Sequence, residues 1–417
     1  MVIAIPVEIA RLIAEFLEDN GSLLNFLLVS RTFYHIAKPL LYTEVSLLGP
    51  IGEVQWDQHE GRSDADLSTM AHGFLSSIVA NGEFANCVKR IRLPAVAFRR
   101  EQYPVFQTIM KSVPNLEDLE VHSSWWREGM IPFNLRTFLE DTHPQSPPIP
   151  FSLKSFAWYT REVQPDGAGL EWFLGRQRDT LERLHLPYLR ISDQFPEIPV
   201  LSRLRVLHAS TIDVARMFNP KASQITHLML ELVNRGEFDE AVLRNVVVWV
   251  TRISAVDIIS EAVVKMSNLE YLEIDTFYST IPNILSRMDA FAGATRLRHL
   301  RIFTTDFDQL RFGKSNRFDH HPWNYNDISK AFESIPSLIH ISIRLVPAAT
   351  YPEFYCFTRG TPRPAKIRSL RPGMPESASY EWWHDWTDDH ATVPFEPNDP
   401  RLGYRSDSLS YRHYPFR

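Results

Sequence analysis

The sequence predicts an α/β protein in which a short helical segment precedes a solenoid of parallel strands and helices. Three observations predict this class. The first 48 residues are far more apolar than the rest, a short strand motif returns nine times between residues 88 and 343, and helical patterns fill the gaps between its copies. The chain has 417 residues, 44% hydrophobic and 23% charged, which suffices to bury such a core and argues against disorder by composition.

The first helical segment is predicted over residues 1–48, where 29 of 48 residues are hydrophobic. Pro6 suits the first position of a helix and Glu8 its first turn, and apolar residues then follow at helical spacing. Asn20-Gly21-Ser22 is a predicted turn, followed by a second helix over Leu23–Val29. Ser30 is the expected cap of a third helix that Pro39 ends.

These three short helices carry more apolar surface than a small domain can bury by itself. A helix that is apolar over most of its circumference must be covered on more than one side. We therefore expect part of residues 1–48 to bind another chain.

Beyond Gly49 the strand motif is of the form L-x-x-L-x-L, with spacings mostly inside the period of about 20–29 residues that is typical of leucine-rich repeats. A 44-residue gap suggests a tenth unit at Ile253-Val256-Ile258. The nine copies are Val88-Ile91-Leu93, Leu116-Leu119-Val121, Leu153-Phe156-Trp158, Leu181-Leu184-Leu186, Leu204-Leu207-Ala209, Ile225-Leu228-Leu230, Leu269-Leu272-Ile274, Leu297-Leu300-Ile302 and Leu338-Ile341-Ile343.

Helices are predicted between the strands, and one strand–helix unit cannot bury both of its apolar faces unless neighbours stack on it. The predicted helices are Tyr103–Val113, Leu170–Thr180, Phe238–Thr251, Ile281–Phe291 and Asp327–Ser334. Residues 49–73 and 141–150 are predicted as exposed loops. The predicted organisation is 1–48 helical domain, 49–87 linker and first helix of the array, 88–349 solenoid, and 350–417 a Pro- and aromatic-rich tail, partly capping or disordered.

The N-terminal residues resemble an F-box of the form common in fungal proteins. The residues that carry the resemblance cover about 3–47 and are Ile5-Pro6-Val7-Glu8-Ile9, Ile13-x-x-Phe16-Leu17, Leu23-Leu24-Asn25-Phe26, Val29-Ser30-Arg31-x-Phe33-Tyr34 and Ala37-x-Pro39-Leu40-Leu41-Tyr42. The resemblance implies a three-helix fold that binds the Skp-type adaptor of a cullin-based ubiquitin ligase, followed by a substrate-binding domain that is often leucine-rich. The adaptor-binding positions it implies are Ile5, Pro6, Ile9, Leu12, Ile13, Leu24, Val29 and Phe33.

A second surface is predicted on the concave face of the sheet. Residues between the inward leucines alternate to the other side of each strand, and most of them are expected to be half-exposed. If this face recognises a target protein, its mixed charge argues against a polyanion as ligand. The candidate residues are Asp118, Glu120, Arg183, His185, His208, His227, Tyr271, Glu273, His299 and Arg301.

The charge and composition of the chain argue against some classes of binding partner. The chain has 44 Lys and Arg against 50 Asp and Glu, a net charge of −6, which supplies no basic field for nucleic acid. Two cysteines, Cys87 and Cys356, cannot build a disulfide framework, which suits a reducing compartment. A signal peptide and the roughly 20-residue apolar run of a membrane helix are not found. We expect an intracellular protein, cytoplasmic or nuclear, with no membrane partner.

No catalytic signature accompanies either cysteine, and 16 glycines make a phosphate-binding loop improbable. Several residues of the tail are of types that bind metals, but they lack a ligand spacing, so we expect neither metal nor cofactor. These residues are His384, Asp385, Asp388, Asp389 and His390. The leading hypothesis is a noncatalytic substrate receptor of a ubiquitin ligase. The alternative is a leucine-rich scaffold whose N-terminal helices only cap the array, and the weakest hypothesis is a hydrolase that uses the histidines and carboxylates of the tail.

Overall fold

The computed structural model divides into two compact units, residues 1–203 (unit 1) and 204–417 (unit 2), each described by itself. The described residues are 5–16, 20–47, 64–94, 103–122, 131–133, 135–139, 150–159, 163–165, 167–189, 198–218, 224–231, 238, 240–252, 256–276, 281–304, 325–345, 353–360 and 365–368.

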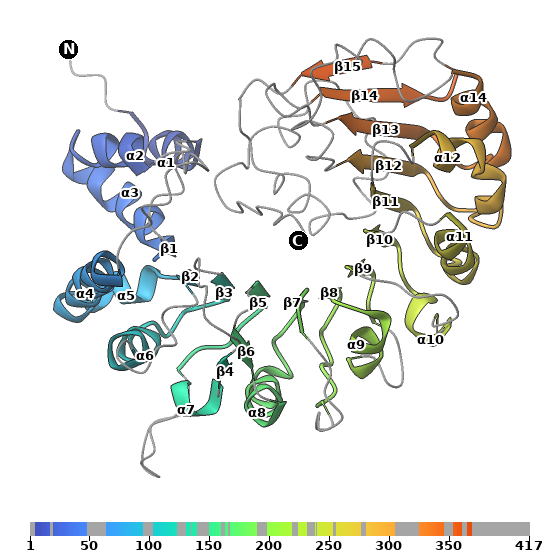
Figure 1. Ribbon diagram of the computed structural model, residues 1–417. Helices are drawn as coiled ribbons and strands as arrows, with labels where there is room; N and C mark the ends of the chain where they lie inside the picture. Colours follow the sequence, from blue (N-terminus) through green and yellow to red (C-terminus); the bar gives the residue numbers. More distant parts are fainter. Residues whose placement is uncertain are drawn as a thin grey trace. The chain divides into compact units, whose positions relative to one another are not determined.

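Unit 1 begins with three helices, α1 (Val7–Phe16), α2 (Asn20–Leu27) and α3 (Arg31–Thr43) (Figure 1). Ser30 caps α3, because its side-chain oxygen accepts a hydrogen bond of 3.2 Å from the backbone N–H of Phe33. The predicted turn at residues 20–22 is wrong, since α2 already begins at Asn20. Polar residues and Gly are tolerated there because the first N–H groups of a helix have no intrahelical partner.

The prediction that Pro39 ends the third helix is also wrong. Helix α3 continues through Pro39 to Thr43, whose hydroxyl donates a 2.6 Å hydrogen bond to the carbonyl oxygen of Pro39. Leu40 and Leu41, in the extra turn, pack against the small core of the three helices. Their burial stabilises a turn that the proline alone would disfavour.

The main sheet of unit 1 has parallel strands in the order β1-β2-β3-β5-β7, with helices along one of its faces (Figure 1). The strands are β1 (Glu44–Ser46), β2 (Arg90–Pro94), β3 (Asp118–His122), β5 (Ser155–Tyr159) and β7 (Arg183–Leu186), while β4 (Ile131–Phe133) pairs with β6 (Val163–Pro165) separately. The helices are α4 (Asp64–Ala80), α5 (Gly82–Cys87), α6 (Tyr103–Ser112), α7 (Leu135–Leu139) and α8 (Gly167–Gln177).

Unit 2 repeats the arrangement with six parallel strands, followed by two antiparallel ones that lie within the predicted tail. The strands are β8 (Val206–Ala209), β9 (His227–Leu230), β10 (Val248–Thr251), β11 (Tyr271–Thr276), β12 (His299–Thr304), β13 (His340–Leu345), β14 (Glu353–Thr358) and β15 (Ala365–Arg368). The helices are α9 (Ile212–Met217), α10 (Glu240–Leu243), α11 (Val256–Lys265), α12 (Ile281–Ser286), the 3₁₀ helix η3 (Met288–Phe291) and α14 (Tyr325–Ser334).

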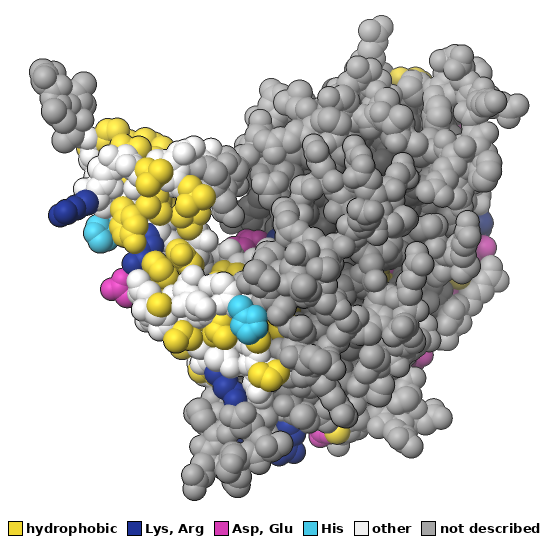
Figure 2. All heavy atoms as spheres, turned by 60° about the vertical axis from the view of Figure 1, so that its left-hand side comes forward, with side chains coloured by type: hydrophobic (Ala, Val, Ile, Leu, Met, Phe, Trp, Pro, Cys, Tyr) yellow, Lys and Arg dark blue, Asp and Glu magenta, His cyan; other side chains and the backbone are white. Residues whose placement is uncertain are grey.

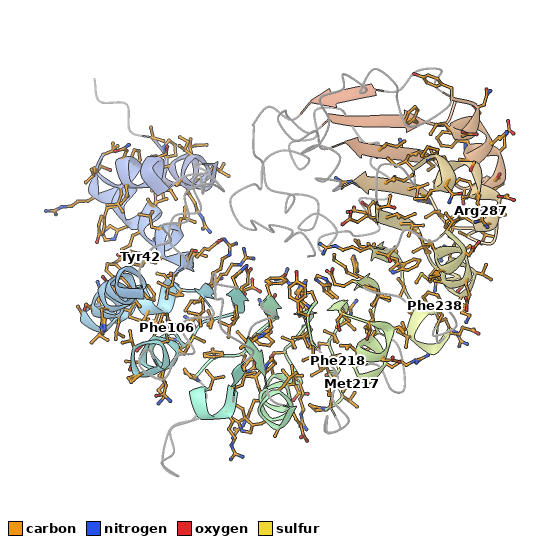
Figure 3. The ribbon with its side chains drawn as sticks, viewed as in Figure 1. Tyr42, Phe106, Met217, Phe218, Phe238 and Arg287 are labelled. Carbon is orange, nitrogen blue, oxygen red and sulfur yellow. The ribbon has the colours of Figure 1, made fainter. Side chains whose placement is uncertain are left out.

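The nine strand motifs lie where the sequence places them, and the prediction of parallel strands with helices is confirmed. All 27 motif residues are at most 2% exposed. The last two residues of each motif lie on one face of the sheet, where aromatic residues such as Phe106 of α6 and Phe238 fill the space below the helices (Figure 3). We call this the helix-covered face and the other the helix-free face.

The structure contains a tenth strand repeat, but it does not lie at the predicted position, Ile253-Val256-Ile258. Strand β10 runs from Val248 to Thr251, and its register aligns Trp249 with Leu228 and Thr251 with Leu230. The tenth motif is therefore Val246-x-x-Trp249-x-Thr251, which lies 21 residues after Ile225 and 23 before Leu269.

The structure also corrects two other predicted segments. The helix expected over Phe238–Thr251 is reduced among the described residues to α10, and the strand takes the rest. The loop expected over residues 49–73 is wrong from Asp64 onward, where α4 begins. Nearly all of the predicted loop at 141–150 lies outside the described residues.

Candidate functional surfaces

Helix α1 buries its small side chains and displays its large ones. Ala10 and Ala14 are at most 1% exposed, and Ala14 belongs to the small core of the three helices. In contrast, Ile9, Leu12 and Ile13 are 47%, 50% and 38% exposed. A helix whose only partner was its own domain would have the opposite arrangement, because burying the larger side chain gains more free energy.

Exposed large hydrophobic residues gather on these N-terminal helices (Figure 2). Of the fourteen such residues found in the described part of the chain, nine lie between residues 5 and 34. We call these nine the apolar patch: Ile5, Val7, Ile9, Leu12, Ile13, Leu24, Leu28, Val29 and Tyr34. A contiguous apolar surface of this kind marks a binding site for another macromolecule.

The predicted adaptor residues all belong to this part of unit 1. Six of them, Ile5, Ile9, Leu12, Ile13, Leu24 and Val29, are members of the apolar patch. Pro6 is exposed beside them. Phe33 is half-buried, because its ring stacks on that of Phe26 at 4.4 Å between centroids. Val7, Leu28 and Tyr34 were not among the predicted adaptor-binding positions, and they extend the patch.

Helix α3 joins the patch to the array. It runs directly into strand β1, which pairs in parallel with β2. Tyr42, labelled in Figure 3, stacks on Phe84 of α5 at 4.2 Å between ring centroids. The ammonium of Lys38 lies 4.5 Å from the Phe84 centroid and 2.9 Å from a carboxylate oxygen of Glu83. One side of α3 thus covers the first strand–helix repeat of the array, while Leu12 of α1 and Leu24 of α2 stay exposed.

The helix-free face of unit 1 carries a ladder of opposite charges. Parallel register places Arg90 beside Asp118 on one side and Glu44 on the other. A nitrogen of Arg90 lies 3.1 Å from Asp118 and another 3.4 Å from Glu44. Arg183 reaches the same Asp118 at 3.4 Å from the strand beyond β5. Asp118 and Arg183 therefore pair with each other rather than presenting free charges.

A second row lies next to it. Arg92, 1% exposed, lies 2.8 Å from Glu44 and 3.1 Å from Glu120, and His122 lies 3.0 Å from the same Glu120 oxygen. Burial by itself raises the pKa of Glu120. The hydrogen bond with His122 and the charges of Arg92 and Arg90 outweigh burial and hold that pKa at about 2. Glu120 is thus ionised at neutral pH.

The helix-free face of unit 2 has an apolar centre. Val206, Met229, Val248, Val250 and Tyr271 come from four neighbouring strands and form one buried cluster, which we call the face cluster. They lie on the side of the strands opposite to Trp249, whose ring meets Phe238 of the helix-covered face at 6.5 Å between centroids. An apolar cluster on this face was not predicted.

Charged and imidazole groups surround the face cluster. Glu231 binds His208 and Arg252, both at 2.6 Å, and Arg252 also lies 3.3 Å from Asp275. Burial lowers the pKa of His208, although its hydrogen bond with Glu231 opposes this.

The other border of the cluster is equally buried. The hydroxyl of Tyr271 donates a 2.6 Å hydrogen bond to Glu273, and Arg301 lies 3.5 Å from the same carboxylate. Burial, and then the negative charge of Glu273, raise the pKa of Tyr271 well above its ordinary value.

The expectation that the candidate target residues are half-exposed is therefore wrong for most of them. Their side chains neutralise or cover one another across strands that lie about 4.8 Å apart. Asp118, Arg183 and His227 are only partly buried. The fully buried ones, at most 8% exposed, are Glu120, His185, His208, Tyr271, Glu273, His299 and Arg301.

Sequence reasoning missed the partners of these residues. Glu44 was not recognised because β1 was not predicted, and Arg90 and Arg92 were not weighed although they occupy the same motif positions as Asp118 and Glu120. Glu231, Arg252 and Asp275 lie just after or at the end of the motif strands. Extending each motif by one residue on the helix-free face would have found them.

His340 and His299 stack at 5.2 Å between ring centroids, and the Nδ1 atom of His340 lies 3.1 Å from the hydroxyl of Thr358 on β14. Burial lowers the pKa of His340, so the folded state favours the neutral ring. In the unfolded chain a histidine binds its proton near pH 6.5. Stability should therefore fall as pH drops below about 6.5, because the unfolded state then binds more protons.

Urea unfolding at pH 7.5 and pH 5.5 measures this loss for the wild type and for His340→Gln. The variant should lose less stability than the wild type between these two pH values, while carboxylates such as Glu120 stay ionised. An equal loss in both proteins would show that another group is responsible.

Among the described residues, no group of three or more His, Cys, Asp or Glu side chains is arranged to hold a metal ion. Nor does that part of the chain contain a helix both long and apolar enough to cross a membrane. Cys87 is a free, partly buried thiol. His384, Asp385 and His390 lie outside the described residues.

No known family model matches the chain, and no curated protein matches it. Among solved structures, the leucine-rich repeat-containing protein LegL7 from Legionella pneumophila is similar, at 8% sequence identity and a TM-score of 0.31. The match covers 63% of this chain and 86% of that protein. The functional assignment therefore rests on the residues of this chain.

Proposed function

We propose that the chain is a noncatalytic substrate receptor of a Skp/cullin/F-box ubiquitin ligase. The apolar patch binds the Skp-type adaptor, and the strand array binds a target protein. The observation that carries the proposal is the exposure of nine large hydrophobic residues on, or directly beside, three helices that bury alanines instead. Covering such a surface with a binding partner removes apolar side chains from water, which is favourable. The F-box resemblance of residues 3–47 names that partner.

The alternative is a leucine-rich scaffold whose N-terminal helices only cap the array. The packing of α3 against α5 and β1 favours it in part. A cap, however, needs its apolar residues turned inward, and Leu12 and Leu24 are 50% and 53% exposed. Adaptor binding accounts for the exposed apolar residues as well as for the packing of α3 against the array, so we prefer it.

Capture from a cell lysate followed by mass spectrometry tests the proposal. Deleting residues 1–48 is unsuitable, because it would uncover Phe84 and the edge of β2. A full-length Leu12→Asp variant is the better comparison, with Val264→Asp as the control, since Val264 is exposed to a similar extent, 63%, on α11. The wild type and Val264→Asp should capture a Skp-type adaptor and a cullin, and Leu12→Asp should not. Equal recovery with Leu12→Asp would reject the proposal.

Target capture should depend on Arg183, the most accessible cation among the candidate target residues, with its side chain 30% exposed. Arg301 is unsuitable for this test, since its loss would leave Glu273 buried without its cation. Arg183→Gln should reduce recovery of the target set about tenfold, as expected for an interface arginine, and leave adaptor recovery unchanged. The control is Arg178→Gln, which removes a charge directly after the last residue of α8 in the same unit. An unchanged target set with Arg183→Gln would place recognition elsewhere.

A further inference from the structure

Helix α3 begins with a charge that its own backbone disfavours. Its first residue is Arg31, and its first turn contains no acidic residue. The N-terminus of a helix carries a partial positive charge, which favours an acidic side chain there and disfavours a cation. Other helices of the chain follow this preference, with Glu8 in the first turn of α1, Asp213 in that of α9 and Asp257 in that of α11. The stability of α3 therefore does not account for Arg31.

The side chain of Arg31 is also exposed and without an ion pair among the described residues. Between residues 5 and 43, the side chains that the structure describes include three cations, Arg11, Arg31 and Lys38, and one acid, Glu8. The chain as a whole has the opposite balance, with a net charge of −6. The described surface of the N-terminal helices is thus basic.

The basic residues of α3 lie beside the apolar patch. Arg31, His35 and Lys38 are spaced at i, i+4 and i+7, so they form one stripe along the helix, which we call the α3 stripe. Tyr34, a member of the patch, joins the two surfaces. Its ring lies 5.5 Å from that of His35 and 5.7 Å from the ammonium of Lys38. Figure 2 shows cationic and imidazole side chains at the border of the hydrophobic ones.

We propose that the partner of the apolar patch presents acidic side chains to the α3 stripe, with a carboxylate opposite Arg31. This inference rests on the proposed function and adds the chemistry of the partner's surface. An ion pair at the border of an interface affects orientation and the rate of association more than affinity. The apolar patch thus supplies the affinity, and Arg31 selects partners that carry an acid at this place.

The far end of the α3 stripe favours a protein over a lipid surface. Lys38 is only 12% exposed and lies 2.9 Å from Glu83 of α5, whose side chain is 79% exposed. Glu83 would repel an evenly anionic membrane that reached this end of the stripe. A folded protein can place a carboxylate at Arg31 and avoid Glu83. The occupant is therefore a protein with acidic residues at one border of its apolar contact surface.

Association kinetics with a purified Skp-type adaptor test this inference, because salt screens exposed charges far more than apolar contacts. The full chain, Arg31→Glu and Arg31→Gln are measured at about 50 and about 500 mM NaCl. We expect the association rate of the wild type to fall about tenfold between these concentrations. At the lower one, Arg31→Glu should associate about five- to tenfold more slowly and Arg31→Gln about two- to threefold more slowly, with little change in dissociation.

The stability of the same variants separates this role from a structural one. Arg31→Glu places an acid in the first turn of α3, so its thermal unfolding should be unchanged or shifted upward while its association slows. If Arg31→Glu instead unfolds at a lower temperature, Arg31→Gln decides, and its association at the wild-type rate would overturn the proposal. The control is Arg205→Glu, since Arg205 is exposed and lies outside the N-terminal helices. It should associate like the wild type.

Other results would also overturn the proposal. Adaptor binding that does not depend on salt, or that is equally fast with Arg31→Glu, would show that no acid faces Arg31. An equal loss with Arg205→Glu would show that only the net charge matters. Binding of the wild type, but not of Arg31→Glu, to mixed phosphatidylserine and phosphatidylcholine vesicles would assign the stripe to a membrane. An adaptor that fails to bind the wild type at either salt concentration would reject the proposed function as well, so the two failures are distinguishable.

Discussion

Ile9→Asp and Leu24→Asp, each introduced into the full chain, should weaken binding of a purified Skp-type adaptor by about ten- to hundredfold. The two residues lie on different helices, and each is about half exposed, at 47% and 53%. Covering such a side chain contributes on the order of 1–2 kcal/mol, and an aspartate in its place adds the cost of burying a charge. Titration calorimetry of each variant against the adaptor measures the loss.

Matched controls separate binding from folding. Val200→Asp and Val264→Asp place the same charge at residues that are 64% and 63% exposed but lie outside the apolar patch. Both should bind the adaptor like the wild type, and the thermal unfolding of all four variants should be nearly unchanged. If the control variants lose as much affinity as the patch variants, the patch is not the binding surface.

Leu272→Ala should destabilise unit 2 by about 2–5 kcal/mol, and Leu184→Ala should do the same in unit 1. Both leucines are 0% exposed on the helix-covered face, in strands β11 and β7. Truncation leaves a cavity between strand and helix that neighbouring repeats cannot fill. Because each repeat is stabilised mainly by its neighbours, the loss should extend to adjacent units of the array.

Urea unfolding measures the loss, and hydrogen exchange locates it. Val264→Ala removes an exposed side chain from α11 and should change stability by no more than about 0.5 kcal/mol. A change below about 1 kcal/mol for both leucine variants would contradict the assigned strand register.

The array was predictable because its leucines have one role. The residues that point toward the helices are apolar in all nine predicted motifs, so the pattern is recognisable despite changes of loop length. Strand β10 was not predicted, because Val246, Val248 and Val250 surround Trp249 and make both faces of the strand apolar. The alternation of apolar and polar residues that identifies a strand is therefore missing. The run of β-branched residues was the remaining signal for a strand.

The two candidate surfaces differed in how far they could be predicted. The excess of apolar residues in 1–48 indicated a binding surface, but which side chains face outward depends on how Ala10, Ala14 and Ala37 let the helices approach. The helix-free face was harder. Its burial depends on pairs such as Arg92 with Glu120, which are 28 residues apart in sequence and meet only through strand register.

Hydrogen exchange of the full chain, with and without a purified Skp-type adaptor, tests the central claim most directly. The account predicts slower exchange in peptides covering α1 and α2 when the adaptor is present, and unchanged exchange in peptides of α11 and α14. Binding that protects other peptides and leaves residues 5–34 unaffected, or an adaptor that does not bind the folded chain at all, would contradict it.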